Sequence, residues 1–187
     1  MGKNISQQLL EFIENSPTCF HAVQAMTDIL SAEGFTELKE NQKWHIENGG
    51  RYFVTRNGSS LTAFTVPFQE MKGMHIIASH SASPSFKIKE NPELESEGHY
   101  IRLNVEGYGG MIRAPWFDRP LSVAGRVIVK DKAQGGFRSI LVDIGRDLVM
   151  IPNLAIHMDR QINDSCKYNI QKDMLPIYGD LSAKGTF

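Results

Sequence analysis

The chain has 187 residues, of which 41% are hydrophobic and 22% are charged, so we expect a packed globular core. Its formal net charge of −1 argues against a general nucleic-acid binder or a membrane-surface binder. No apolar run is long enough to cross a bilayer, and the N-terminus lacks the apolar core of a signal peptide. Two cysteines, Cys19 and Cys166, do not make a disulfide framework and fit a reducing compartment. We therefore expect a cytoplasmic protein without membrane or nucleic-acid partners.

Two amphipathic helices are predicted at the N-terminus. In ISQQLLEFIENSP, residues 5–17, the apolar side chains that share one helical face are Ile5, Leu9, Phe12 and Ile13. Ser16 as the N-cap and Pro17 in the first turn predict the start of a second helix. Its apolar stripe holds Val23, Met26 and Leu30, and it is expected to end near Gly34.

Three strands are predicted next. RYFVTRNGSSLTAFTV, residues 51–66, predicts a β-hairpin, because Asn57-Gly58 separates two β-rich runs. GMHIIAS, residues 73–79, is apolar almost throughout and predicts a strand buried on both faces. Helices followed by mixed strands favour an α/β layer.

His80 is the strongest candidate for chemistry in this first part. It follows the apolar run, at the expected carboxyl end of a buried strand, where open α/β sheets place their ligand sites. A neutral imidazole there can bind zinc. The alternative is a histidine hydrogen-bonded in a turn ahead of Pro84, and position alone favours this alternative slightly. His75 lies on the opposite face of the same predicted strand and is not expected to share a metal with His80.

A change of composition follows at Lys89–His99, KENPELESEGH, which is polar and turn-prone and predicts a domain boundary or exit loop. YIRLNVEGY, residues 100–108, then alternates apolar and polar side chains as a half-buried strand does. Further strands are predicted in residues 121–131 and 137–145, and two more around Pro152.

No helix signal comparable to the first two appears after Gly34. From Asn163 the pattern fades, and MLPIYGDLSAKGTF, residues 174–187, shows no recognisable final element. We therefore expect that the chain is a piece of a longer protein.

Two further regions hold candidate binding residues. In WFDRPLSVAGR, Asp118 and Arg119 are suited to charged groups and Trp116 to an interface. The alternative is a loop closed by a local Asp–Arg pair under the Trp. His157 stands among apolar neighbours, for which a buried, hydrogen-bonded histidine is the default interpretation. Residue patterns alone thus predict an α/β part followed by a β part, but no reaction.

Several long stretches resemble the N-terminal part of M18-type zinc aminopeptidases, the aspartyl aminopeptidase family. In chain order they are SPTCFHAV, GGRYFVTRNGSSLTAF, ASHSASPSFKIKENPE, VEGYGGMIRAPWFDRPLSVAGRV, LVDIG and IPNLAIHMDR. The resemblance runs from about the first helix to the last residues.

This resemblance implies an α/β catalytic domain interrupted by a β-rich insertion that mediates dimer contacts. Residues 1–88 would be the first, incomplete segment of the catalytic domain, and residues 89–187 the β-rich dimerisation insertion. Members of the family form closed homo-oligomers and remove N-terminal residues, often acidic ones, from peptides with two metal ions. Zinc, peptide substrates and partner subunits are therefore the expected ligands and partners.

The resemblance also assigns roles to individual residues. His80 matches the first metal-ligand histidine, and His157 matches an insertion histidine that reaches the substrate in a neighbouring subunit. Ala82 stands where the family motif, His-Thr-Asp-Ser-Pro, has an aspartate that steadies the ligand imidazole. Loss of such a carboxylate typically costs about 10–100-fold in affinity or activity.

In the family, the remaining metal ligands and the general-base glutamate follow the insertion, beyond Phe187. No catalytic residue is therefore assigned to this chain, and the isolated chain is expected to be inactive. An alternative is a non-catalytic oligomerisation protein that keeps the insertion and its dimer surface. A third possibility is an unstable gene remnant, because the predicted strand at residues 73–79 would lack neighbours to cover it.

Overall fold

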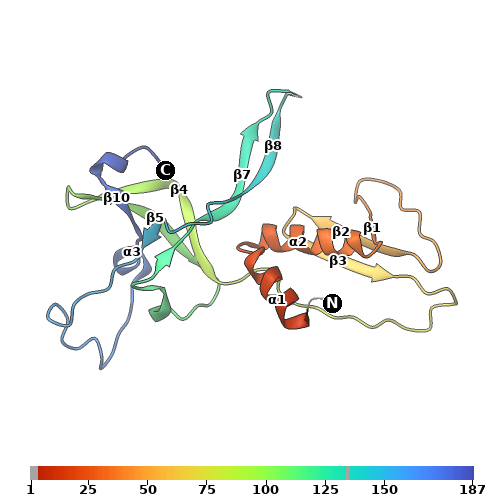
Figure 1. Cartoon of the computed structure of the whole chain (residues 1–187), viewed down its shortest axis with the longest axis horizontal. Helices are drawn as coiled ribbons and strands as arrows, with labels where there is room; N and C mark the ends of the chain where they lie inside the picture. The colour runs from red at the N-terminus through yellow and green to blue at the C-terminus, as the bar shows by residue number, and fades with distance from the viewer. Residues whose placement is uncertain (1–3, 134) are drawn as a thin grey trace. The chain divides into compact units, whose positions relative to one another are not determined.

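The computed structural model describes residues 4–133 and 135–187, which form helices and β-sheets (Figure 1). The chain divides into two compact units. Unit 1 holds the residues up to Ser83 together with Ala124–Asp143, and unit 2 holds Pro84–Val123 and Ile144–Phe187. In the described part of the chain, no helix is long and apolar enough to cross a membrane.

Unit 1 contains two helices, a three-stranded sheet and a separate two-stranded hairpin. The elements are α1 (Ile5–Glu14), α2 (Cys19–Ala32), β1 (Thr36–Glu37), β2 (Arg51–Arg56), β3 (Ser60–Thr65), β7 (Ala124–Lys130) and β8 (Phe137–Asp143). The sheet order is β1-β2-β3, with β1 parallel and β3 antiparallel to β2, and β7 pairs with β8.

The two predicted helices and the β2–β3 hairpin are confirmed, with one correction. The N-cap of α2 is Thr18 rather than Ser16, because Thr18 is extended and its side-chain oxygen accepts from the backbone N–H of His21. Asn57 (φ 54°) and Gly58 (φ 62°) both adopt the left-handed conformation that a tight hairpin turn requires. Val23 of α2 and Phe53 of β2 are buried in the core of this unit.

The strand predicted at residues 73–79 is absent from the structure. Residues 67–79 follow β3 as an irregular segment whose side chains are exposed, and Ile77 is 98% exposed. Apolar composition does not make a strand on its own, because each strand needs a neighbour for its backbone N–H and C=O groups. Within the described residues this segment pairs with no strand.

Unit 2 is built on a five-stranded sheet in the order β4-β5-β10-β9-β6. Its elements are β4 (Ser85–Ser96), β5 (Tyr100–Tyr108), the 3₁₀ turn η1 (Ala114–Trp116), β6 (Pro120–Leu121), β9 (Val149–Met150), α3 (Ile170–Asp173), β10 (Ile177–Asp180) and the 3₁₀ turn η2 (Leu181–Ala183). The strand β5 is confirmed as predicted, with Ile101, Leu103 and Val105 buried and at most 2% exposed.

The loop predicted at Lys89–His99 is wrong. Most of it lies in β4, which pairs antiparallel with β5 on both sides of a bulge between Ile88 and Glu93. Pro92 lacks a backbone N–H, so the bulge lets the strand pass a residue that cannot join the ladder. The chain passes from unit 1 to unit 2 between Ser83 and Pro84, returns to unit 1 at Ala124 and re-enters unit 2 at Ile144.

The end of the chain is also more ordered than its sequence indicates. Residues 174–187 supply β10, which lies between β5 and β9, and Met174 and Leu175 are buried beside it. The short helix α3, which has no sequence signal, precedes them. Around Pro152, by contrast, only β9 and a single bridge from Ile151 to Phe117 form, and residues 152–158 are not a strand.

Candidate metal and substrate residues

An irregular segment follows β3 (Figure 1). His80 lies at the end of that segment, in unit 1. Its side chain is exposed. The next residue is fastened to the β2–β3 turn, because the hydroxyl of Ser81 donates a hydrogen bond of 2.9 Å to the backbone oxygen of Ser59. Ala82 is half-buried and carries no polar group. The structure thus holds the backbone next to His80, while the imidazole faces solvent.

The donors near His80 do not suffice for zinc. A zinc site needs at least three protein ligands. In residues 4–133 and 135–187, no group of three or more His, Cys, Asp or Glu side chains is arranged to hold a metal ion. The described residues alone therefore do not complete the zinc site that the resemblance implies.

His157 lies in unit 2, in an exposed turn where the backbone N–H of Met158 donates to the oxygen of Ala155 over 2.8 Å. The surrounding loop, residues 152–169, also exposes Leu154, Ile156 and Met158. The default interpretation of a buried, hydrogen-bonded histidine is therefore wrong. His80 belongs to unit 1 and His157 to unit 2.

The ends of the His157 loop are fastened within unit 2. At the first end, the carboxylate of Asp118 accepts from the backbone N–H of Asn153 over 2.9 Å, and the N–H of Asp118 donates to Ile151 over 2.9 Å. At the other end, Arg113 donates to the backbone oxygen of Tyr168, whose ring lies 4.6 Å from that of Phe117.

Asp118 holds the first end of this loop through a contact that the sequence pattern did not indicate. It adopts φ 55°, a conformation that Asp tolerates better than most residues. Its carboxylate reaches a backbone N–H 35 residues along the chain, whereas the sequence offered only a partner next to it, Arg119. Trp116 is half-buried and packs edge-on against Phe86, with ring centres 5.0 Å apart.

In the described part of this loop, the phenol of Tyr168 has a shifted pKa. A side-chain hydrogen bond with Cys166 raises the pKa of Tyr168, because it stabilises the neutral phenol. Cys166 and Tyr168 both lie in the segment whose end is held by the hydrogen bond from Arg113 to the backbone oxygen of Tyr168.

Comparison with known proteins identifies the family of this fold. Residues 12–185 match the family model described as aminopeptidase I zinc metalloprotease (M18). The chain belongs to the M18 family. A probable M18 family aminopeptidase 2 from Clostridium acetobutylicum is 49% identical over 181 residues, which cover 96% of this chain and 42% of that relative. The chain thus spans less than half the length of this relative.

Solved structures of the family share the fold. The mApe1 structure from Chaetomium thermophilum has a TM-score of 0.85 at 36% identity, covering 94% of this chain and 40% of that one. The mApe1 dodecamer of S. cerevisiae has a TM-score of 0.79 at 28% identity, covering 94% of this chain and 38% of that one. The predicted family is therefore confirmed, and the mixture of sheets and helices agrees with the predicted α/β class.

Proposed function

We propose that this chain forms the N-terminal part of an M18-type metalloaminopeptidase that removes N-terminal residues, often acidic ones, from peptides. The observation that carries the proposal is the match of residues 12–185 to the M18 family model. In this proposal residues 1–88 belong to the catalytic domain, and residues 89–187 form the β-rich insertion that mediates subunit contacts. The free thiols of Cys19 and Cys166 support a cytoplasmic location.

We assign His80 to one zinc ion of a two-metal site whose other ligands come from outside the described residues. Ser81 supports this assignment, because its bond to Ser59 limits the motion of the backbone that carries His80. Ala82 weakens the site, because a methyl group cannot accept the imidazole N–H or add negative charge. The 187 residues are therefore proposed to be inactive by themselves.

A chimera tests this proposal. The chain replaces the equivalent 42% of the Clostridium acetobutylicum relative, to which it is 49% identical. Turnover is measured with zinc on peptides that begin with Asp, Glu, Leu or Ala. We expect slow turnover with Ala82, about 10–100-fold faster turnover in the Ala82→Asp chimera, and none in the His80→Ala chimera. His75→Ala is the matched control, since His75 is the other histidine of the same segment.

Two results would contradict the proposal. A folded chimera whose turnover is unchanged by His80→Ala would remove His80 from the metal site. Robust zinc-dependent turnover by the 187-residue chain alone would show that its own residues complete a site.

We further propose that the protein is a homo-oligomer in which His157 contacts the substrate bound to a neighbouring subunit. The exposed turn of His157 and the fastened ends of its loop support this role. Mixed oligomers test it. The chimera carrying His80→Ala should have no activity and the one carrying His157→Gln should lose most of it, and mixing the two should restore part of it. Failure of mixing to restore any activity, with mixed oligomers shown to form, would contradict a contact between subunits.

A second function is favoured by Ala82 and by the absence of a three-donor metal group in residues 4–133 and 135–187. The chain would then be a non-catalytic subunit that assembles with intact relatives. Co-expression with the full-length relative, followed by size-exclusion chromatography with light scattering, separates the two functions. The second function is supported if the chain joins oligomers of the relative but adds no activity to them. A strictly monomeric chain excludes it.

A further inference from the structure

Arg126, near the base of β7, joins the hairpin β7–β8 to two other elements of unit 1. Its guanidinium lies 4.0 Å from the ring centre of Phe20 in α2. The same group donates to the backbone oxygen of Asn57 over 2.6 Å and to its side-chain oxygen over 3.1 Å. A guanidinium is attracted to an aromatic ring at this distance, and its planar set of donors can bond a second group at the same time. Arg126 thus connects the β2–β3 turn with α2 and with the hairpin.

The β2–β3 turn needs such support because of its backbone conformation. Asn57 adopts φ 54° and Gly58 adopts φ 62°. The turn is closed by the backbone N–H of Ser59, which donates to the backbone oxygen of Arg56 over 3.1 Å. Left-handed backbone is less favourable for asparagine than for glycine. A donor that binds both oxygens of Asn57 therefore stabilises the turn.

The same turn holds the backbone beside His80. The hydroxyl of Ser81, which is half-buried, donates to the backbone oxygen of Ser59 over 2.9 Å. Ser59 lies two residues after Asn57, so a displacement of Asn57 also moves the oxygen that Ser81 binds. Contacts within unit 1 thus run without a break from Arg126 through the turn to the residue next to His80.

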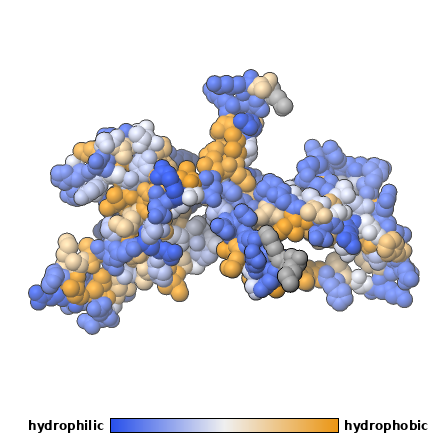
Figure 2. Space-filling view, viewed as in Figure 1, coloured by the Kyte–Doolittle hydropathy of each residue, from blue (hydrophilic) through white to orange (hydrophobic). Residues whose placement is uncertain are grey.

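The far end of the hairpin lies in solvent. Phe137 is 72% exposed, and Lys130, with which it pairs, is exposed too. Figure 2 shows largely hydrophilic surface near the tip. A two-stranded hairpin is marginal in water without packing, so the contacts of Arg126 at its base matter for its placement.

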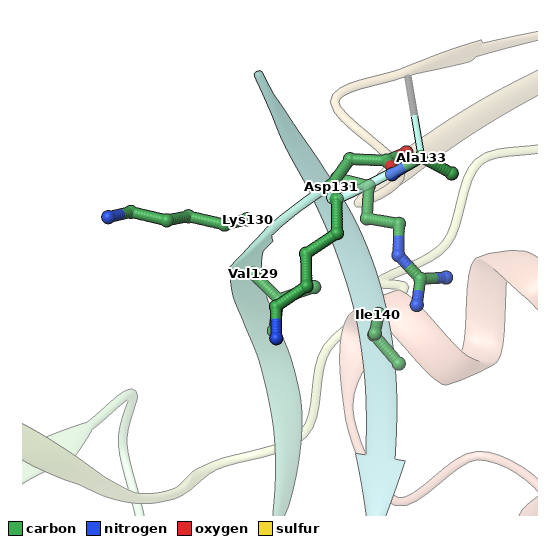
Figure 3. Close-up of a pocket in the computed structure, with 7 residues that line it drawn as sticks. Val129, Lys130, Asp131, Ala133 and Ile140 are labelled. Atoms are coloured by element: carbon green, nitrogen blue, oxygen red, sulfur yellow. The ribbon is translucent and has the colours of Figure 1, made fainter. Parts of the chain in front are cut away.

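A second arginine of the hairpin offers a matched control. Arg138 pairs with Val129 and therefore projects from the face opposite to that of Arg126. It lines a shallow depression there together with Val129 and Ile140 (Figure 3). Replacing Arg138 removes the same charge from the same hairpin but leaves the contacts with Phe20 and Asn57 in place.

We propose that Arg126 is a positioning residue for the segment that carries His80. It holds the β2–β3 turn, and the turn holds Ser81 and with it the backbone of His80. Because Arg126 belongs to the part of the chain that the proposed function assigns to the insertion, the insertion helps to place a residue of the catalytic segment. This inference rests on the proposed role of His80 and adds a residue on which the placement of His80 depends.

Nuclear magnetic relaxation of backbone amides in the 187-residue chain is the test. We expect the order parameter of the His80 amide to fall from about 0.85 in the parent chain to below about 0.6 in Arg126→Ala. Hydrogen exchange of the Ser59 amide should become about tenfold faster, because a hydrogen bond to a charged donor contributes a factor of that size. Arg126→Lys keeps a charged donor without the planar group and should give intermediate values. Arg138→Ala should change neither quantity, and unchanged amide signals of β2 verify folding.

A double-mutant cycle separates action through the turn from general loosening of unit 1. Ser81→Ala removes the hydroxyl that binds Ser59 and should by itself raise the mobility of the His80 amide. In that background, Arg126→Ala should lower the order parameter of His80 no further, because both substitutions break the same series of contacts. Additive effects of the two substitutions would contradict a common route.

Turnover of the Ala82→Asp chimera supplies a functional measurement. Arg126→Ala should lower kcat about tenfold and leave the KM of the peptide unchanged, because it misplaces His80 and does not alter the contacts of the peptide. Arg126→Lys should recover part of the lost kcat. A change in KM alone would point to substrate binding and would overturn the positioning role.

The outcomes separate this inference from the proposed function. An unchanged His80 amide in a folded Arg126→Ala chain would overturn the inference, whatever the turnover. Turnover that is lost in His80→Ala but unchanged in Arg126→Ala would keep the proposed function and also overturn the inference. Turnover unchanged by His80→Ala would overturn the proposed function, while the relaxation measurement would still decide whether Arg126 holds the segment.

Discussion

Residues 100–108, which alternate apolar and polar side chains, and residues 73–79, which are apolar almost throughout, were both predicted as strands, yet only the first is a strand in the structure. Strand β5 lies between β4 and β10, and Ile101 at its start is fully buried. The segment that holds Ile77 has no strand partner in the described residues, and its side chains face solvent. The two stretches differ in whether they have adjacent strands, because hydrogen bonding and burial in a sheet come from adjacent strands.

The same comparison separates the two candidate residues. His157 is carried by a loop whose ends are fastened to a sheet with a buried core. His80 ends an exposed segment that pairs with no strand in the described residues. We therefore expect variants in the core of unit 2 to change stability, and variants of residues 67–80 to change it little.

Removal of Met174–Phe187 should have the largest effect. It deletes β10 and the buried side chains of Met174 and Leu175, and it exposes the edge of β5 to water. We expect unit 2 to lose its cooperative fold. Hydrogen exchange at the amides of β4 measures this, because β4 pairs with β5 outside the deleted segment. Replacing Asn163–Ser165 by Gly-Ser-Gly is the control, and retained protection of β4 in the truncated chain would contradict the expectation.

The comparison becomes quantitative with two matched substitutions. Ile101→Ala leaves a cavity in the core of unit 2 and should lower the free energy of unfolding by about 2–5 kcal/mol. Ile77→Ala changes a side chain that is 98% exposed and should change it by no more than about 0.5 kcal/mol. Urea unfolding measures both values. Equal effects would mean that residues 73–79 are buried in solution.

A smaller effect is expected at Asp118. Asp118→Ala removes the acceptor for the Asn153 N–H and places alanine at positive φ, which should cost about 1–2 kcal/mol. Asp118→Asn keeps an acceptor oxygen and tolerates that conformation, so it should cost less. Exchange of the Asn153 amide and urea unfolding measure the difference. Identical behaviour of the two variants would show that Asp118 does not hold the loop.

The smallest expected effect is the pH dependence of local stability around Glu93. The backbone N–H groups of Gly185 and Phe187 donate to Glu93 over 2.6 and 3.0 Å and lower the pKa of its carboxyl. Lys184, which pairs with Glu95 at 3.1 Å, lowers that pKa further.

Because the folded-state pKa lies below the unfolded value of about 4.3, this stabilisation is complete above the unfolded value and is lost as pH falls through the folded value. Exchange protection at Gly185 should follow that course in the parent chain. In Glu93→Gln it should be weaker and independent of this titration. A parallel pH dependence in both proteins would exclude Glu93 as its origin.

The elements that the sequence predicted correctly are determined by residues close together along the chain. Asn57-Gly58 encodes its own turn, and the alternation in residues 100–108 encodes one buried face. Strand β10 has only four residues and includes Gly179, so its place between β5 and β9 depends on pairing that no local pattern records. Pro92 was predicted to lie in a loop. A bulge that accommodates a proline within a strand can be recognised only when the partner strand is known.

The candidate residues divide in the same way, between those found from local motifs and those whose contacts are distant in the sequence. The resemblance identified His80 and His157 by motif, and both roles stay predictions. Asp118 was noticed as a charged residue, but its contact with Asn153 spans 35 residues and could not be inferred from spacing. The exposure of His157 was missed because its apolar neighbours Ile156 and Met158 are themselves exposed.

Zinc binding by the 187-residue chain tests the central claim most directly, namely that this chain supplies one ligand of a site that other residues complete. Competition with a chromophoric chelator in zinc-free buffer measures the affinity and stoichiometry. We expect no stoichiometric binding at micromolar zinc and no change on His80→Ala. One tightly bound zinc per chain that is lost in His80→Ala would contradict the account, because the described residues would then complete a zinc site themselves.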